Sequence, residues 1–298
     1  MKIFNLSEKV FSELEKLTLG NGIVNTMAEL YHMPKDSDEI LLIFKMFHST
    51  DETYLADKIK TITSLMEQER NYAIPALVYP KGLVTIEDEL YGYAMPYIKG
   101  TNLKVYMNDP KVSFDKKRNA LIQIGRLLEE MKKVREETPF TDFYLNDIHE
   151  SNFIVDNQTG KVKFVDIDSC SINGNILDRS MYQRPVSKFR NMPEKYPTQK
   201  DGYFGTYLIP SDDTEIYSYN SMILNLIAGE NIGCLNPGAM LDYIAYLEGL
   251  NYPFEFLCDL ISMYSTTKPS RNPVDNLESL EYNPESTFYK YIRSPKTF

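Results

Sequence analysis

Three oxygen-bearing side chains follow one another closely in the stretch from Asp142 to Ile172. Asp147 precedes Asn152 by five residues, an apolar run follows, and Asp166 comes directly after a second apolar run. Residues 156–160 between these runs are Asp, Asn, Gln, Thr and Gly, so we expect two short strands joined as a hairpin. Asn152 and Asp166 would then lie at the same end of the hairpin, where their oxygens suit a hard cation such as Mg²⁺ beside phosphate.

A lysine interrupts an otherwise apolar run further upstream. Lys45 lies within residues 40–47, ILLIFKMF, whose apolar side chains are typical of a buried strand. An ammonium group that is buried without a partner is costly, so Lys45 needs an anionic neighbour if its strand lies inside a sheet. The alternative is an edge strand that carries Lys45 on its solvent-exposed face.

The order of these residues resembles the catalytic and metal-binding loops of the protein kinase superfamily, where an Asp, four residues, an Asn, a hairpin and a second Asp recur. The resemblance implies Asp147 as catalytic base, Asn152 as a metal ligand, and Asp166 as the main Mg²⁺ ligand. It also implies that Lys45 contacts the α- and β-phosphates of ATP. The alternative is that Asp147 and Asn152 are ordinary turn residues. Asp168 stands where a Gly is typical, and either supports the metal ligands or is simply solvated.

Residues 53–70 predict a helix after the strand of Lys45, because apolar side chains recur there at helical spacing: Leu55, Ile59, Ile62 and Met66. In protein kinases, an acidic residue of this helix pairs with the strand lysine. The resemblance makes Asp57 the first candidate for this partner of Lys45 and Glu67 the second. Asp is one methylene shorter than the usual Glu, so the helix would have to approach the strand more closely.

A glycine-containing turn precedes the strand expected at residues 26–33. Gly20, Asn21 and Gly22 form its centre. By resemblance to the Gly-rich loop of kinases, their backbone N–H groups would approach the nucleotide phosphates. The match is partial, because Asn25 occupies the place of the third Gly, and an ordinary turn is the alternative.

Residues 94–103, AMPYIKGTNL, resemble the hinge of kinases, whose backbone hydrogen-bonds the adenine edge. In this resemblance Met95 gates the rear pocket. The Pro96 carbonyl accepts a hydrogen bond from the adenine amino group, and the Ile98 N–H donates one to the ring. Asn102 would lie near the ribose.

Four positions depart from the usual protein kinase pattern. Asn146 stands where regulated kinases carry an Arg, so we expect activity that does not depend on phosphorylation of residues 169–206. His149 is similar to the His of aminoglycoside and choline phosphotransferases, which act on small molecules. Ser211 stands where a Glu is usual, and Glu215 where an Asp usually anchors the catalytic loop.

The remaining pattern predicts a hairpin over residues 76–97 and a long helix over residues 115–136. Two further helices are expected at residues 240–250 and 254–264. The tail, residues 268–298, is polar with four Pro, and we expect it to follow the surface or to be partly disordered.

Composition excludes several classes of protein. The 298 residues carry a net charge of −10 without a cluster of Lys and Arg, which argues against a nucleic-acid partner. The longest apolar stretch, residues 222–228, is far shorter than the ~20 residues of a membrane span. The first residues lack a signal-peptide pattern. We therefore expect a cytoplasmic protein that does not insert into a membrane.

The resemblance implies an α+β, bilobal protein-kinase-like fold, with a β-rich lobe at residues 1–98 and a helical lobe at residues 99–298. The expected function is transfer of the γ-phosphate of ATP, with Mg²⁺, to a hydroxyl group of a protein Ser or Thr. One alternative is a small-molecule kinase of the aminoglycoside or choline phosphotransferase type. The other is a pseudokinase that binds nucleotide or partners without transfer, which the incomplete Gly-rich loop, Asp57 and Glu215 suggest.

Overall fold

The computed structural model describes residues 2–17, 28–33, 42–47, 51–176, 194–201, 205–233 and 235–294. The chain forms two compact units. The first contains Met1–Thr101, Val134–Phe143 and Ser151–Leu177, and the second contains Asn102–Lys133, Tyr144–Glu150 and Asp178–Phe298. The first unit is rich in strands and the second in helices, which confirms the α+β prediction. The lobe boundary at residue 98 stays a prediction.

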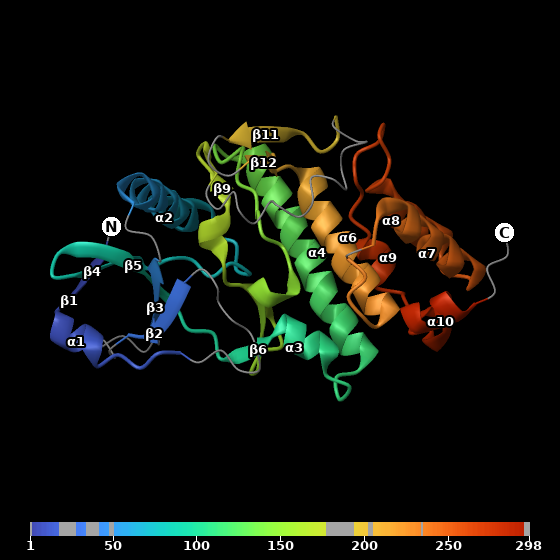
Figure 1. Ribbon diagram of the computed structural model, residues 1–298, viewed down its shortest axis with the longest axis horizontal. Coiled ribbons are helices and arrows are strands. Elements are labelled where there is room, and N and C mark those ends of the chain that lie inside the picture. Colours follow the sequence, from blue (N-terminus) through green and yellow to red (C-terminus); the bar gives the residue numbers. More distant parts are fainter. Residues whose placement is uncertain are drawn as a thin grey trace. The chain divides into compact units, whose positions relative to one another are not determined.

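A five-stranded sheet forms the framework of the first unit, in the order β1-β4-β5-β3-β2 (Figure 1). Strand β1 is parallel to β4, and the other neighbours are antiparallel. The hairpin of β4 and β5 turns through Glu87 and Asp88, which both have positive φ, as tight hairpin turns require. The strands are β1 (Ile3–Leu6), β2 (Ala28–His32), β3 (Leu42–Phe47), β4 (Gly82–Ile86) and β5 (Glu89–Pro96).

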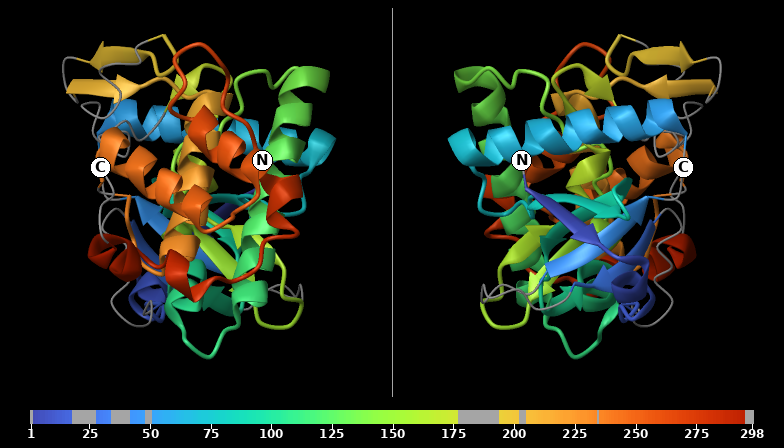
Figure 2. Two further views of the ribbon diagram at one scale, coloured as in Figure 1. Left: turned by 90° about the vertical axis from the view of Figure 1, so that its right-hand side faces the viewer. Right: turned by 90° about the vertical axis from the view of Figure 1, so that its left-hand side faces the viewer.

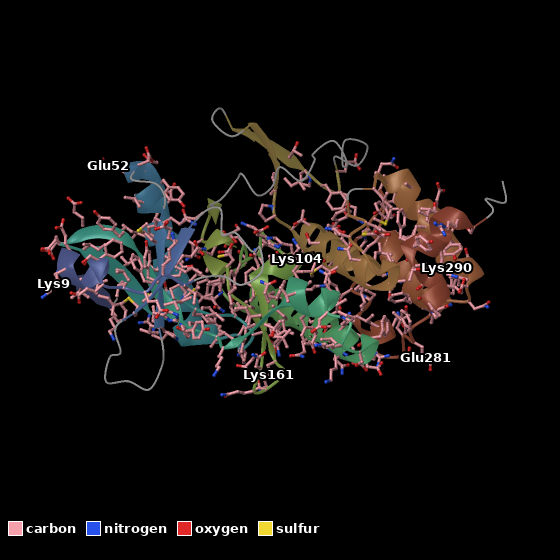
Figure 3. The ribbon with its side chains drawn as sticks, turned by 60° about the horizontal axis from the view of Figure 1, so that its bottom comes forward. Lys9, Glu52, Lys104, Lys161, Glu281 and Lys290 are labelled. Atoms are coloured by element: carbon pink, nitrogen blue, oxygen red, sulfur yellow. The ribbon has the colours of Figure 1, made fainter. Side chains whose placement is uncertain are left out.

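Helix α2 (Glu52–Tyr72) runs beside this sheet (Figure 2) and confirms the helix predicted after the strand of Lys45. The side chain of Asp51 accepts from the Tyr54 N–H at 2.8 Å and so caps the helix, whose first residue is Glu52, labelled in Figure 3. The short helix α1 (Glu8–Ser12) follows β1. The buried face of α2 mixes apolar and polar side chains, namely Lys58, Thr61, Ile62, Ser64, Leu65 and Gln68.

The hairpin predicted around residues 156–160 is confirmed as β7 (Phe153–Asp156) and β8 (Val162–Phe164). It pairs with β6 (Gly100–Asn102), which approaches so closely that a Cβ on Gly100 would lie 2.3 Å from the Val155 carbonyl oxygen. On the other side, the Val78 N–H donates to the Phe164 carbonyl at 3.0 Å. Short elements flank the hairpin: η1 (Glu150–Asn152), η2 (Ile167–Ser169), β9 (Ser171–Ile172) and β10 (Asn175–Ile176).

The second unit is built around α4 (Phe114–Glu137) and α6 (Asp212–Ala228), which lie side by side (Figure 1). The Tyr219 hydroxyl of α6 donates to the Leu121 carbonyl of α4 at 2.9 Å. Only the last residues of α4 belong to the first unit. The other elements are α3 (Leu103–Asn108), β11 (Thr198–Asp201), β12 (Gly205–Leu208), α7 (Pro237–Gly249), α8 (Phe254–Ser262), α9 (Val274–Leu277), η4 (Pro284–Ser286) and α10 (Phe288–Arg293).

The carboxyl-terminal segment packs on this helical unit through α9 and η4. Val274 and Leu277 are buried, and the Ser286 hydroxyl donates to the Ile227 carbonyl at 3.2 Å. The helices predicted at residues 115–136, 240–250 and 254–264 correspond to α4, α7 and α8. Among the helices that the structure describes, none is both long enough and apolar enough to cross a membrane.

Candidate functional site

Lys45 lies on β3, between β5 and β2, and only 7% of its surface is exposed. The alternative of an exposed edge strand is therefore wrong. Its ammonium group forms ion pairs with Asp166 and, at 2.7 Å, with Asp168. Burial alone would lower the pKa of Lys45, but the two negative charges outweigh burial and raise this pKa well above its ordinary value. Lys45 is therefore a buried ammonium group held between two carboxylates.

Asn152 and Asp166 lie at the same end of the β7–β8 hairpin. Phe153 pairs with Phe164, and the Val165 N–H donates to the Asn152 carbonyl at 3.0 Å, one residue before Asp166. The side chain of Asp166 is 26% exposed, so its carboxylate is accessible although it contacts Lys45. The backbone of the hairpin thus places Asn152 and Asp166 next to each other at one end of the hairpin.

Asp168 is buried, and the prediction that it is simply solvated is wrong. Its carboxylate accepts hydrogen bonds from Lys45 at 2.7 Å, from the Tyr93 hydroxyl at 2.5 Å and from Lys58 at 2.9 Å. Burial alone would raise the pKa of Asp168. The two lysines and the Tyr93 hydrogen bond outweigh burial and hold this pKa well below its ordinary value. Asp168 is therefore ionised and fully engaged.

The ion pair predicted between Lys45 and Asp57 does not form. Asp57 lies on a half-exposed face of α2 and pairs instead with Lys60 at 3.2 Å, while the second candidate, Glu67, is exposed. The reason is the rotation of the helix, which turns Lys58 rather than an acid toward the interior. Lys58 lies three residues before Thr61 and four before Ile62, on the buried face. The spacing of Lys58 from Thr61 and Ile62 is the feature of the sequence that places Lys58 on the same face of the helix as these residues.

The residues predicted to bind the nucleotide are placed only in part. Gly20, Asn21 and Gly22 lie outside the described residues. Met95 is buried opposite Ile43 in the sheet, and Pro96 is the last residue of β5. Ile98 follows in a segment that belongs to no strand, so its backbone is not used by a sheet ladder.

Asn102 has a structural role in the described fold. Its side-chain oxygen accepts from the Lys104 N–H at 3.0 Å and caps the amino-terminal end of α3. Contact with a ribose stays a prediction for this residue.

Asp147 belongs to the loop Tyr144–Glu150 of the helical unit, and only 5% of its surface is exposed. One carboxylate oxygen lies 3.0 Å from His149 Nε2. The buried carboxylate of Glu215, in the first turn of α6, accepts from the Leu145 N–H at 2.7 Å. Glu215 thus anchors this loop although an Asp is usual at its position, and the longer side chain does not prevent the contact.

Replacing Glu215 with Ala should destabilise the helical unit by about 1–3 kcal/mol, because the buried Leu145 N–H would lose its acceptor. Thermal or urea unfolding measures this loss. Asp212→Ala is the matched control, since Asp212 lies in the same helical turn but is exposed, and its loss should stay below ~1 kcal/mol. Equal losses for the two variants would show that the Glu215 contact adds nothing.

Comparison with solved structures identifies this arrangement of elements. The chain is similar to the kinase domain of the maize sucrose-induced receptor kinase 1, crystallised with AMP-PNP, at a TM-score of 0.58 and 16% identity. The likeness covers 91% of this chain and 95% of the maize chain. This chain has a protein-kinase-like fold. No protein-family model and no curated protein matches the sequence.

The kinase-like fold raises the question of whether its residues fit Mg²⁺. Within the described part of the chain, no group of three or more His, Cys, Asp or Glu side chains could hold a metal ion by itself. Mg²⁺ does not need such a cage, because it commonly binds one or two carboxylates together with substrate phosphates and water. The accessible carboxylate of Asp166, with Asn152 at the same hairpin end, fits that requirement.

Proposed function

We propose that this protein is a phosphotransferase that uses ATP and Mg²⁺ to phosphorylate a hydroxyl group. The observation that carries this proposal is the buried ammonium of Lys45 held against Asp166, at the hairpin end that also bears Asn152. A kinase-like fold and the AMP-PNP bound to the maize kinase domain support ATP as the nucleotide. Met95, Pro96 and Ile98 are the proposed adenine contacts.

Each of these residues has a separate role in the proposed transfer of phosphate. Asp166 and Asn152 would hold Mg²⁺, which when bound supplies positive charge against the phosphate oxygens. Lys45 adds a fixed positive charge that needs no rearrangement, since the fold already buries it as a cation. Asp147 orients the acceptor hydroxyl and takes its proton. A hydrogen bond with His149 holds one carboxylate oxygen of Asp147 in position.

The acceptor that we favour is a Ser or Thr hydroxyl of a protein. One observation favours a small molecule as a second candidate. The helical unit contains a pocket of about 500 Å³, a volume typical of small-ligand sites, lined among others by Lys104 (labelled in Figure 3), Lys117, Glu150 and Asn225. Glu150, which lines the pocket, follows Asp147 by three residues, so even a fully extended backbone separates their Cα atoms by at most about 11 Å. One wall of the pocket therefore lies near the proposed base.

Labelled phosphate transfer tests the proposal. The protein is incubated with Mg²⁺ and γ-labelled ATP, alone, with a generic basic protein, and with a panel of aminoglycosides, choline and sugars. We expect Mg²⁺-dependent label on the protein acceptor, and label on a small molecule would identify the second candidate. Saturable ATP binding without transfer would leave only the pseudokinase. Failure to bind ATP with or without Mg²⁺ would refute the proposal altogether.

A further inference from the structure

Asp168 connects three separate elements of the first unit. One carboxylate oxygen accepts from Lys45 of β3 at 2.7 Å and from the Tyr93 hydroxyl of β5 at 2.5 Å. The other accepts from Lys58 of α2 at 2.9 Å. Only 3% of the Asp168 side chain is exposed. Both oxygens are therefore committed, and strand and helix are joined through a single carboxylate.

Lys58 is buried more completely than Lys45, with 1% of its side chain exposed. An ammonium group at such a depth is tolerated only beside an anion and further hydrogen-bond acceptors. Asp168 supplies both, because Lys58 also donates to its backbone carbonyl at 3.1 Å. Through Lys58, helix α2 thus hydrogen-bonds both the backbone carbonyl and the side chain of Asp168.

The pairing has the opposite polarity to the one expected from kinases. There, the helix supplies an acid to the strand lysine. Here, the helix supplies a lysine, and the acid comes from the segment that also carries Asp166. The charges of the cluster balance, because Lys45 and Lys58 face Asp166 and Asp168. A second contact supports the same docking of α2, since Asn173 Nδ2 donates to the Ser64 hydroxyl at 3.0 Å.

We propose that Lys58 is a positioning residue which, through Asp168, fixes both Lys45 and the segment of Asp166 in the geometry that Mg²⁺ and ATP require. The inference rests on the proposed function for its catalytic consequence, but the ion pair itself does not. In this arrangement, helix α2 and the proposed metal-binding segment move together, because one buried side chain holds the carboxylate and the carbonyl of the same residue.

Kinetics of Lys58 variants test the positioning role. Lys58→Met keeps the length of the side chain without its charge, and kcat/KM for Mg-ATP should fall roughly 10–100-fold, as for residues that orient metal ligands. Lys58→Arg should recover part of this loss. Lys60→Met is the control, because Lys60 lies on the exposed face of the same helix, and it should stay within about twofold of wild type. The assays are run well below the unfolding temperature of each variant. Wild-type kcat/KM in folded Lys58→Met would overturn the role.

A double-mutant cycle tests the ion pair without any assay of activity. Asp168→Asn leaves Lys58 buried without its anion, so its unfolding temperature should drop by on the order of 5–10 °C. Adding Lys58→Met to Asp168→Asn should recover part of that drop. Additive shifts would overturn the inference. If the wild-type protein neither bound ATP nor transferred phosphate, the proposed function would fail while this cycle still decided whether the pair ties α2 to Asp168.

Discussion

An Asp147→Asn variant should lose roughly 10²–10⁴ in kcat, the range that a positioned general base contributes, and should retain nearly normal affinity for Mg-ATP. Asn has almost the shape of Asp and can still accept a hydrogen bond from His149, which lies 3.0 Å from the carboxylate. It cannot take a proton from the acceptor. The measurements are steady-state transfer of labelled phosphate and a thermal-shift titration with Mg-ATP.

The matched control for this variant is Asp156→Asn. Asp156 is likewise an aspartate of the segment around the proposed metal ligands, but it is the last residue of β7 and accepts from the Gln158 N–H of the hairpin turn at 2.9 Å. An Asn side chain can make the same bond, so activity should be unchanged. If Asp147→Asn were as active as this control, Asp147 would not be the base.

Replacing Lys45 with Met should cost about 3–5 kcal/mol of stability, because Asp166 and Asp168 would lose the cation that they share. Affinity for ATP should fall as well, since the proposed phosphate contact is removed. Lys58 still neutralises Asp168 in this variant, so we expect a folded but weakened protein. Urea unfolding measures the first effect, and a titration with ATP measures the second.

Lys16→Met provides the control for Lys45→Met. Lys16 pairs with Glu29 in the same unit, but 58% of its side chain is exposed. Water and salt screen such a pair, which contributes about 0–1 kcal/mol. Equal loss of stability in the two variants would contradict the view that Lys45 is an essential buried charge.

The sequence predicts those features that depend on local pattern. Lys45 could be found because one charge interrupts an apolar run, and the β7–β8 hairpin because turn residues separate two short apolar runs. Helix α4 followed from its apolar stripe and lies within one residue of the predicted bounds at each end. Each of these elements can be predicted because its sequence pattern is contained within about 25 consecutive residues.

The partners of Lys45 could not be predicted in the same way. Asp166 and Asp168 lie more than 120 residues away from it, and only the fold decides which acid reaches the ammonium. The resemblance points to Asp57 because protein kinases take the acid from this helix. The rotation of α2 was decisive, because Ile62 is the only one of the four apolar residues used to predict the helix that lies on its buried face. Lys58, on that face, would have been the better guide.

Strand β1 was not predicted at all, and its place in the sheet has a consequence for how the protein is made. Ile3 pairs with Leu83, eighty residues later in the chain, whereas β4 and β5 adjoin through a short turn. Distant closure carries the larger entropy cost, so we expect β1 to join after the β4–β5 hairpin has formed. Until then, the outer backbone groups of β4 have no partner and can attract strands of other molecules. By completing this edge of the sheet, Ile3–Leu6 protects it from aggregation.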